Sequence, residues 1–388
     1  MSKRVAILGS TGSIGQNALR VIAALGPEYE VVALTAHSRT DLLVAQVKQF
    51  KPAVVAITHP DFESECKSSL NGYSGQILCG PETLAEIVTR EDVDIVLCAI
   101  VGAAGLPAVL AAAQAGKRLA IANKEPLVIA GELLTREAAA SGAQILPIDS
   151  EHSAVFQALQ AGRRQEVRRI VLTASGGPFL RTDRAKMEKD TAKQALAHPT
   201  WRMGPKITID SATMMNKALE IIEARWLFGL PVEQIDVLIH PESVVHSMVE
   251  FIDGSIIAQM GAPDMKTPIQ YALTYPERRT GIAECLKLEE MGRLLFEPPD
   301  FERFPALSLG YRAAQEGGSA PVVFNAANEA AVAAFLENRI RFGRIIELIE
   351  QALEAHCPHK RLSLEALLET DSWARQFVQR RLECMNPV

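Results

Sequence analysis

The sequence predicts an α/β protein with an N-terminal parallel sheet, an α+β middle region and a C-terminal bundle of helices. Three observations predict this order. Strand-like and helix-like runs alternate up to about residue 149, the pattern changes there, and residues 308–388 read as helical. Alternation is typical of a parallel sheet, because each crossover between parallel strands usually carries a helix. We expect domains at 1–149, 150–283 and 310–388, joined by a linker at 284–309.

The strands of the N-terminal region are expected where β-branched, apolar runs occur, and helices where the segments between them are amphipathic. A sheet of this kind binds ligands beyond the carboxyl ends of its strands. We expect strands at 4–9, 30–36, 53–57, 94–100, 118–122 and 144–148, and helices at 17–25, 41–50 and 133–140.

The middle and C-terminal regions follow a different pattern. Asp253-Gly254 is a hairpin signal, and the consecutive prolines of 297–305 cannot continue a helix. We expect strands at 169–174, 237–239, 244–251 and 255–260, a long polar loop up to residue 209, and helices from about 153 and at 213–228, 325–337 and 342–355.

Composition excludes several classes of function. With 40 Lys and Arg against 46 Asp and Glu, the 388-residue chain has a formal net charge of −6, which argues against a protein that mainly grips nucleic acid. Its six cysteines are scattered without a CxxC pair, so we expect a reducing compartment, the cytoplasm. The N-terminus goes directly into a strand pattern, so we expect no signal peptide.

One uncharged stretch, residues 95–116, is long enough to span a bilayer. Its front half is β-branched, its back half is rich in alanine, and Gly102 and Gly105 lie between them. We interpret it as a strand, a turn and a helix that opens at Leu106-Pro107. We therefore expect no membrane association.

The first strand ends in a glycine-rich loop, Gly9-Ser-Thr-Gly12-Ser-Ile-Gly15, that leads into a helix. Glycines let backbone approach a phosphate, and the helix N-terminus supplies N–H donors and the positive end of its dipole. The spacing is GxxGxxG rather than GxGxxG, so a tight turn without a ligand remains an alternative. The position after the first strand favours a Rossmann-like dinucleotide site.

The end of the second strand indicates which dinucleotide binds. NAD enzymes usually place an acid there for the ribose hydroxyls, but this chain has His37-Ser38-Arg39 and no acid before Asp41. Asp41 resembles a helix cap. Arg39 with Ser38 suits a 2′-phosphate, which favours NADP; the alternative is that Arg39 is a solvated surface residue.

Two strand ends carry polar side chains suited to chemistry. Lys124, in Ala122-Asn-Lys-Glu125, could hold a substrate oxygen, or could be an exposed loop charge. Asp149 and Glu151 are two residues apart, so in an extended chain they point the same way. Oxygen donors without a thiolate suit Mg²⁺ or Mn²⁺. The alternative is a pair of acids that stabilises a helix N-terminus.

A polar helix face follows in the middle region. Thr213, Asn216, Lys217 and Glu220 are spaced to share one face of a helix, while Met215, Leu219 and Ile222 share another. That face could present a carboxylate to a metal and an ammonium to a phosphate, or it could simply face solvent.

Two loops add candidates. Ser175, followed by two glycines, suits a phosphate-binding turn, and Trp201 in the loop 198–204 could close over a ligand or pack beneath the loop. His246 is more typical of a core histidine. His356 and His359 have no second ligand pair, which disfavours a metal site there.

Together these motifs resemble 1-deoxy-D-xylulose 5-phosphate reductoisomerases, enzymes of the methylerythritol phosphate route to isoprenoids. The motifs run across most of the chain in the family's order. They are 9–15, 122–125, 149–152, 175–179, 198–204, 210–217 with Glu220, and 240–246.

The resemblance implies a cytoplasmic, NADPH-dependent homodimer that uses a divalent metal, Mg²⁺ or Mn²⁺, and acts on a sugar phosphate. The reaction would rearrange 1-deoxy-D-xylulose 5-phosphate and reduce it to 2-C-methyl-D-erythritol 4-phosphate. Domain 1–149 would bind NADPH and domain 150–283 the metal and substrate. The implied metal ligands are Asp149, Glu151 and Glu220; the substrate residues are Lys124, Ser150, Glu151, Ser175, His198, Ser211, Asn216, Lys217 and Glu220; the NADPH residues are Thr11, Gly12, Ser13, Ile14, Asn123, Glu125 and Gly204, beside His37, Ser38 and Arg39.

Three positions depart from the family's usual pattern: Pro126, Ala218 and Arg39. Arg39 leaves the individual cofactor contacts of residues 37–39 open.

Two other functions compete with this one. A semialdehyde dehydrogenase would need an exposed cysteine nucleophile, whereas Cys98 lies in an apolar strand. A non-catalytic nucleotide-binding protein would have no use for three acids beside an Asn-Lys pair.

Overall fold

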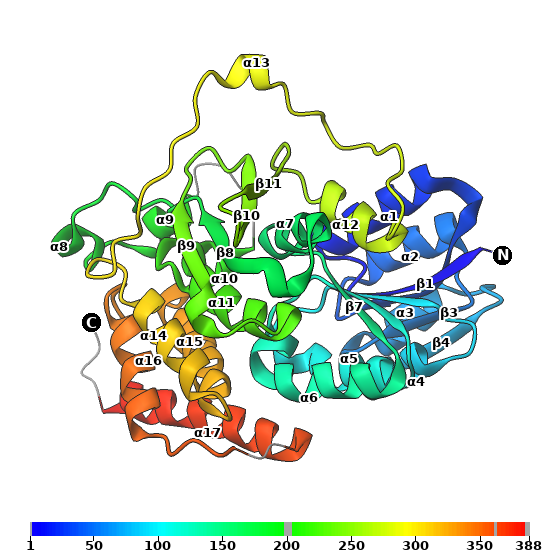
Figure 1. Cartoon of the computed structure of the whole chain (residues 1–388). Coiled ribbons are helices and arrows are strands. Elements are labelled where there is room, and N and C mark those ends of the chain that lie inside the picture. Colours follow the sequence, from blue (N-terminus) through cyan, green and yellow to red (C-terminus); the bar gives the residue numbers. More distant parts are fainter. Residues whose placement is uncertain (1, 198–203, 361–362, 385–388) are drawn as a thin grey trace. The chain divides into compact units, whose positions relative to one another are not determined.

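The computed structural model describes residues 2–197, 204–360 and 363–384, and the chain divides into two compact units (Figure 1). Unit 1 comprises Met1–Pro126, Leu134–Ser153 and Asp264–Glu284. Unit 2 comprises Leu127–Leu133, Ala154–Pro263 and Cys285–Val388. Each unit has its own sheet.

Unit 1 is built on a seven-stranded parallel sheet in the order β4-β3-β2-β1-β5-β6-β7. The strand order reverses between β1 and β5, which opens a crevice at their carboxyl ends where dinucleotides bind in such folds. The expected strands are confirmed. The edge strand β4 was not expected, because four residues between Gly75 and Gly80 give too short a pattern. The strands are β1 (Lys3–Leu8), β2 (Tyr29–Ala36), β3 (Val54–Ile57), β4 (Gln76–Cys79), β5 (Ile95–Cys98), β6 (Arg118–Ile121) and β7 (Gln144–Pro147).

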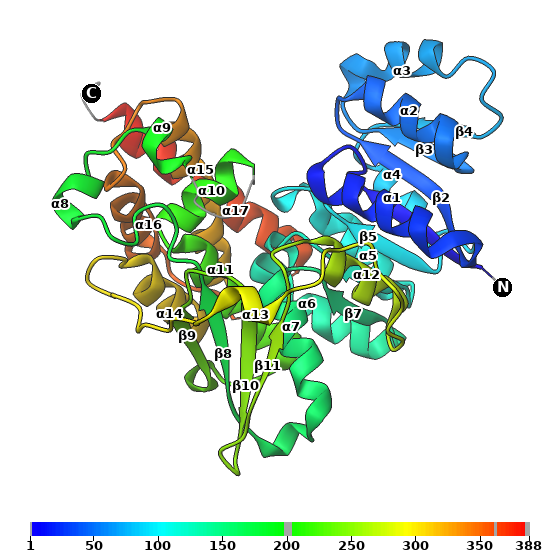
Figure 2. The same ribbon diagram turned by 90° about the horizontal axis from the view of Figure 1, so that it is seen from above.

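Helices cover both faces of this sheet, as the alternating pattern predicts. Helices α1, α2 and α12 lie on one face and α4 and α5 on the other (Figures 1 and 2). Helix α12, which packs on α1, was not expected, because the chain returns to unit 1 only after crossing unit 2. The helices are α1 (Ser13–Leu25), α2 (Thr40–Phe50), α3 (Glu63–Ser69), α4 (Thr83–Thr89), α5 (Leu106–Gln114), α6 (Glu125–Ser141) and α12 (Lys266–Thr274). The segment Leu127–Leu133 of α6 belongs to unit 2.

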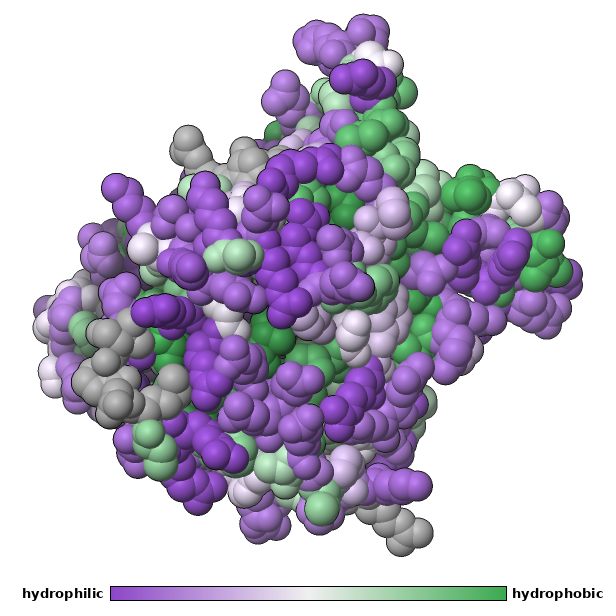
Figure 3. Space-filling view, turned by 90° about the vertical axis from the view of Figure 1, so that its left-hand side faces the viewer, coloured by the Kyte–Doolittle hydropathy of each residue, from purple (hydrophilic) through white to green (hydrophobic). Residues whose placement is uncertain are grey.

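The uncharged stretch 95–116 forms β5, a turn and α5, with Pro107 in the first turn of the helix. This confirms the interpretation from sequence. Among the described residues, no helix is long and apolar enough to cross a membrane. The face drawn in Figure 3 is mostly hydrophilic, with hydrophobic residues interspersed.

Unit 2 contains a four-stranded sheet in the order β11-β10-β8-β9. Strands β8 and β9 are parallel, and β10 is antiparallel to both β8 and β11. The predicted hairpin between β10 and β11 is confirmed: Gly254 turns with φ +85° and its N–H donates to the Phe251 carbonyl. The strands are β8 (Val167–Ala174), β9 (Ile235–Ile239), β10 (Val245–Phe251) and β11 (Ile256–Met260).

Helices of unit 2 pack on this sheet and on one another around one apolar core. Helix α11 contacts β8, β9 and α14, while α15 contacts α16 and α17. The expected loop up to residue 209 was wrong: it contains two short helices and α10, which begins at Pro205 with Gly204 as its N-cap. The helices are α8 (Arg184–Met187), α9 (Ala192–Ala195), α10 (Pro205–Ala212), α11 (Met215–Phe228), α13 (Leu288–Met291), α14 (Ala306–Glu316), α15 (Ala320–Leu336), α16 (Arg344–Ala355) and α17 (Leu364–Glu383). Helix α7 (Ser150–Ala158) crosses from unit 1 into unit 2.

His356 holds the loop after α16 in its neutral form. Its Nε2 lies 2.7 Å from the Ser319 Oγ, which accepts a hydrogen bond from the His359 N–H at 2.8 Å. The hydroxyl can donate its own proton to Nε2 only while that nitrogen is unprotonated. Burial, with His359 nearby, lowers the pKa of His356 below 6.5.

We expect unit 2 to lose stability as the pH falls below about 6.5, because the unfolded chain then binds a proton on His356 that the folded chain binds only at lower pH. All three tryptophans belong to unit 2, so their fluorescence reports on its unfolding. Urea midpoints at pH 8 and pH 5.5 should differ more for the wild type than for His356→Gln. Equal differences would show that this histidine is not the sensor.

Candidate active site

The glycine-rich loop lies between β1 and α1 as expected. Gly9 has φ +81°, and a Cβ there would stand 2.7 Å from the Ala99 carbonyl oxygen. A Cβ on Gly15 would stand 2.4 Å from the Gly9 oxygen, so the loop folds back tightly on itself. Gly12 caps α1 without a side-chain hydrogen bond, which leaves the helix N-terminus suited to an anion.

The two glycines of this loop should respond differently to alanine. Gly15→Ala should destabilise unit 1 by about 1–3 kcal/mol, because the new methyl meets backbone. Gly12→Ala should leave the fold intact, since its Cβ would come no nearer than 3.4 Å, yet weaken NADPH binding at the phosphates. Circular-dichroism melting and NADPH titration separate the two effects. Equal melting temperatures for the two variants would contradict this.

Residues Asn123, Lys124 and Glu125 follow β6, and all three are buried. The Lys124 Nζ donates to the Asp149 Oδ2 at 2.7 Å, so the alternative of an exposed loop charge is wrong. In the described part of the chain, the Asn123 amide has no hydrogen-bond partner on either its nitrogen or its oxygen. A buried, unpaired amide at a strand's carboxyl end suits a ligand that brings both a donor and an acceptor, such as a carboxamide.

Residues 37–39 lie at the carboxyl end of β2. His37 and Arg39 are exposed and Ser38 is half-buried. The Arg39 Nη1 donates to the Thr11 carbonyl oxygen at 3.1 Å, which ties this loop to the glycine-rich loop. Arg39 is therefore not simply solvated. The prediction that Asp41 caps the helix was wrong, because α2 begins at Thr40 and its N-cap is Arg39.

Asp149 and Glu151 lie at the junction of β7 and α7. The two carboxylates do converge, with oxygens within 4.8 Å of each other. The expected reason, an extended chain, was wrong, because α7 begins at Ser150 and Glu151 lies in its first turn. Ser150 and Glu151 are joined by a hydrogen bond from Oγ to Oε2, at 2.5 Å. Asp149 also pairs with Lys124.

In unit 2, the loop after β8 carries Ser175. The Gly177 N–H donates to the Ser175 Oγ at 3.2 Å. Gly176 and Gly177 both have positive φ, and a Cβ on Gly177 would stand 2.5 Å from the Ser211 carbonyl oxygen. The glycines therefore allow the Ser175 loop to lie directly against α10 at Ser211.

The polar face of α11 is confirmed for three of its four predicted members. The Asn216 Nδ2 donates to the Glu220 Oε1 at 2.6 Å, and the Lys217 ammonium forms a buried ion pair with the Glu220 Oε2. The prediction that Thr213 belongs to this face was wrong. Thr213 is the C-cap of α10, and Met214, with φ +61°, separates α10 from α11. Lys217 and Glu220 are buried, so this is not a solvent face.

The remaining predicted residues lie away from these groups or outside the described residues. His198 and Trp201 lie outside the described residues, and Gly204 is exposed at the start of α10. His246 is buried in β10, as expected of a core residue. Among the described residues, no group of three candidate metal ligands includes His356 or His359.

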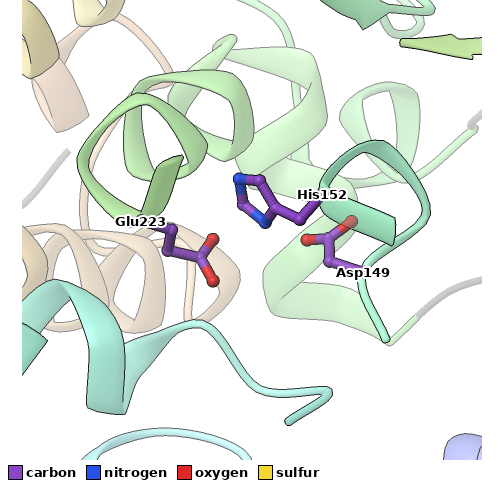
Figure 4. Close-up of side chains that lie close together, drawn as sticks. All are labelled: Asp149, His152 and Glu223. Carbon is purple, nitrogen blue, oxygen red and sulfur yellow. The ribbon is translucent and has the colours of Figure 1, made fainter. Parts of the chain in front are cut away.

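Sequence reasoning gave no role to two further buried polar side chains. His152 follows Glu151 on α7, and Glu223 lies three residues after Glu220 on α11. Figure 4 labels both, together with Asp149. His152 belongs to the Asp149-Ser-Glu-His152 motif, so the sequence could have indicated a role for it. Nothing in the local pattern distinguished Glu223 from a surface acid.

Cys98, on β5 of the unit 1 sheet, does not suit the rival function that needs an exposed cysteine nucleophile. Cys98 is fully buried on β5, and desolvation raises the pKa of its thiol to about 12. A thiol with that pKa does not form the reactive thiolate near pH 7.

Comparison with known proteins identifies the family. Models of the 1-deoxy-D-xylulose 5-phosphate reductoisomerase family match residues 5–131, 145–228 (its C-terminal domain) and 260–377 (DXP reductoisomerase C-terminal domain). The chain is 51% identical over 374 residues to the 1-deoxy-D-xylulose 5-phosphate reductoisomerase of Geotalea uraniireducens, covering 96% of this chain and 97% of the relative. The chain belongs to this family.

Other members agree over the full length. The enzyme of Chloroherpeton thalassium is 49% identical over 386 residues, covering 100% of both chains. The solved structure of the family enzyme from Zymomonas mobilis in complex with NADPH superposes with a TM-score of 0.94 at 43% identity, covering 99% of this chain and 100% of that one. A family structure in complex with NADPH, fosmidomycin and magnesium gives 0.93 at 43% identity, covering 98% of each.

Proposed function

We propose that the residues described above carry out the reaction of this family in the following way. The chain is an NADP-dependent oxidoreductase that converts 1-deoxy-D-xylulose 5-phosphate to 2-C-methyl-D-erythritol 4-phosphate with NADPH and a divalent metal, Mg²⁺ or Mn²⁺. The roles of individual residues are our assignments.

NADPH is assigned to the carboxyl edge of the unit 1 sheet. Thr11, Gly12, Ser13 and Ile14 would hold the pyrophosphate at the start of α1. Asn123 would pair its buried amide with the nicotinamide end, near Glu125. His37, Ser38 and Arg39 would hold the 2′-phosphate, and Gly204 is assigned to the cofactor as well.

The metal is assigned to Asp149, Glu151 and Glu220, which are oxygen donors of the kind that Mg²⁺ and Mn²⁺ prefer. Each is already paired with a cation or donor of the protein: Asp149 with Lys124, Glu151 with Ser150, and Glu220 with Lys217 and Asn216. A bound divalent cation supplies positive charge that stabilises negative charge developing on the substrate's oxygens during the rearrangement.

The sugar phosphate is assigned to the hydroxyl, amide and ammonium side chains predicted from sequence. Ser175, Ser211, Asn216 and Lys217 would hold the phosphate, because hydroxyl, amide and ammonium donors suit it. His198 would join them from outside the described residues. Lys124 and Ser150 would hold the carbon chain.

The chain's own residues position the substrate for both steps. The Asn216 Oδ1 is buried, with no hydrogen-bond partner among the described residues, so it is suited to accept from a substrate hydroxyl. The Lys124 ammonium, fixed by Asp149, can donate to an oxygen of the carbon chain. Holding the phosphate fixes the distance from the anchored end to the reacting carbons.

One observation carries these assignments: Asn216, Lys217 and Glu220 form one hydrogen-bonded group on α11, in which Lys217 and Glu220 are buried and Asn216 is half-buried. Burying a carboxylate and an ammonium costs desolvation free energy, which favours a functional reason for keeping the pair at this position. NADPH consumption at 340 nm with 1-deoxy-D-xylulose 5-phosphate, with Mg²⁺ and then with EDTA, tests the function. Decay that EDTA does not suppress would contradict the metal's role.

We also propose that the chain is a homodimer in the cytoplasm. β11 is an edge strand, and Ile256 and Ile257, which point to opposite faces of it, are 55% and 38% exposed. An exposed apolar edge strand is a template for pairing with another chain, and we assign that role to a second copy of this chain. The cytoplasmic assignment rests on the six free cysteines.

Ile256→Lys should shift the chain from dimer to monomer, because a charge on the edge strand opposes pairing. Size-exclusion chromatography with light scattering measures the mass. Lys67→Ala, on α3 of unit 1, is the control and should leave the mass unchanged. A wild type of single-chain mass at micromolar concentration would contradict the proposal.

A further inference from the structure

The loop after β3 places a second histidine beside the residues assigned to the 2′-phosphate. The Thr58 N–H donates to the Ala36 oxygen at 2.9 Å and the His59 N–H donates to the His37 oxygen at 3.0 Å. These bonds continue the β2–β3 ladder past the strand ends, so residues 37 and 59 emerge side by side at the carboxyl edge of the sheet.

The two imidazoles form a contact pair. Their centroids are 5.1 Å apart with an interplanar angle of 67°, and the Phe62 ring lies 5.3 Å from His59 on a T-shaped contact. His59 is half-buried, whereas His37 is exposed. Packing between His37 and Phe62 therefore fixes the His59 ring, which lowers the entropy lost when it binds a ligand.

Hydrogen bonds set which nitrogen of each ring is available. The Asp61 N–H donates to the His59 Nδ1 at 3.3 Å, so the proton of neutral His59 lies on Nε2. The His37 Nδ1 is 3.0 Å from the Thr58 hydroxyl, which can donate to it in the same manner. Over residues 2–197, 204–360 and 363–384, neither Nε2 has a hydrogen-bond partner. Each ring can thus present an N–H donor outward.

We propose that His59 is a specificity residue for NADPH, and that its Nε2–H, beside His37 and Arg39, donates to the adenosine 2′-phosphate. Arg39 is held at this edge by its bond to the Thr11 oxygen, which links the set to the pyrophosphate loop. Two imidazole donors and a guanidinium offer a phosphate several hydrogen bonds, whereas a 2′-hydroxyl can use only one or two. This inference rests on the placement of NADPH on unit 1 proposed above.

The test compares two fragments that differ only in this phosphate, 2′,5′-ADP and 5′-AMP, as competitive inhibitors of the full chain against NADPH. His59→Glu should raise the inhibition constant of 2′,5′-ADP about tenfold or more, because the 2′-phosphate loses a hydrogen bond and is repelled by the new carboxylate. The inhibition constant of 5′-AMP should change about twofold or less. His59→Gln keeps a donor and should stay within about threefold for both.

Two further variants serve as a positive and a negative control. Arg39→Asp should lower the preference for 2′,5′-ADP as His59→Glu does. Asn71→Asp adds one negative charge in the loop that leads to the amino end of β4, away from the carboxyl ends of the strands, and should change neither inhibition constant. An unchanged ratio in His59→Glu, or equal losses for both fragments, would overturn the role of His59. If the wild type itself shows no preference for 2′,5′-ADP, the proposed cofactor site fails instead.

Discussion

Glu220→Gln should lower kcat/KM for 1-deoxy-D-xylulose 5-phosphate by at least about 100-fold, a loss of about 2.7 kcal/mol of transition-state stabilisation. The change replaces one carboxylate oxygen by an amide nitrogen, which cannot ligate Mg²⁺. NADPH binding should stay within about twofold, because the residues assigned to the pyrophosphate belong to unit 1. Steady-state rates over a range of Mg²⁺ concentrations, with a fluorescence titration of NADPH, measure both quantities.

Glu223→Gln is the matched control for this variant. It makes the same change three residues further along α11, at another buried carboxylate. The Mg²⁺ concentration for half-maximal rate should rise steeply in Glu220→Gln and little in Glu223→Gln. The reverse order would move the metal away from Glu220 and towards Glu223.

Lys217→Met should destabilise unit 2 by about 3 kcal/mol and raise the KM for the substrate. The Lys217 ammonium is paired with the Glu220 carboxylate in a site where neither side chain is more than 3% exposed. Removing one member of a buried pair leaves a charge without its counterion, which typically costs about 3–5 kcal/mol. Tryptophan fluorescence in urea follows this loss, because all three tryptophans belong to unit 2.

A double variant separates folding from binding in this experiment. Lys217→Met with Glu220→Gln removes both charges and should recover most of the stability but none of the activity. Lys206→Met is the control on α10, where Asp210 keeps a second partner in Asn328. It should cost less than Lys217→Met. Stability that stays low in the double variant would contradict a simple pairing role.

The predictable parts of the site are those that depend on local geometry. Asn216, Lys217 and Glu220 are at helical spacing, so their contact follows once α11 forms. The glycine-rich loop was predictable because it directly follows β1. Thr213 failed because the left-handed Met214 interrupts the helix, and no side-chain pattern signals that break.

The parts that were missed depend on contacts distant in sequence. Helix α12 joins unit 1 by packing on α1, more than 200 residues earlier in the chain. The His37–His59 pair exists because β2 and β3 are neighbours with a particular register. Burial of Lys124 likewise depends on its pairing with Asp149 across β6 and β7. None of these pairings leaves a periodic signal in the sequence.

The assignment of one divalent cation to Asp149, Glu151 and Glu220 is tested most directly by counting bound Mn²⁺. The electron paramagnetic resonance signal of free Mn²⁺, titrated into the chain with NADPH present, gives the number of ions bound and their affinity. We predict one Mn²⁺ per chain in the wild type. Asp149→Asn, Glu151→Gln and Glu220→Gln should each weaken it at least about tenfold, and Glu223→Gln much less. Wild-type affinity in any of the three carboxylate variants would contradict the assignment.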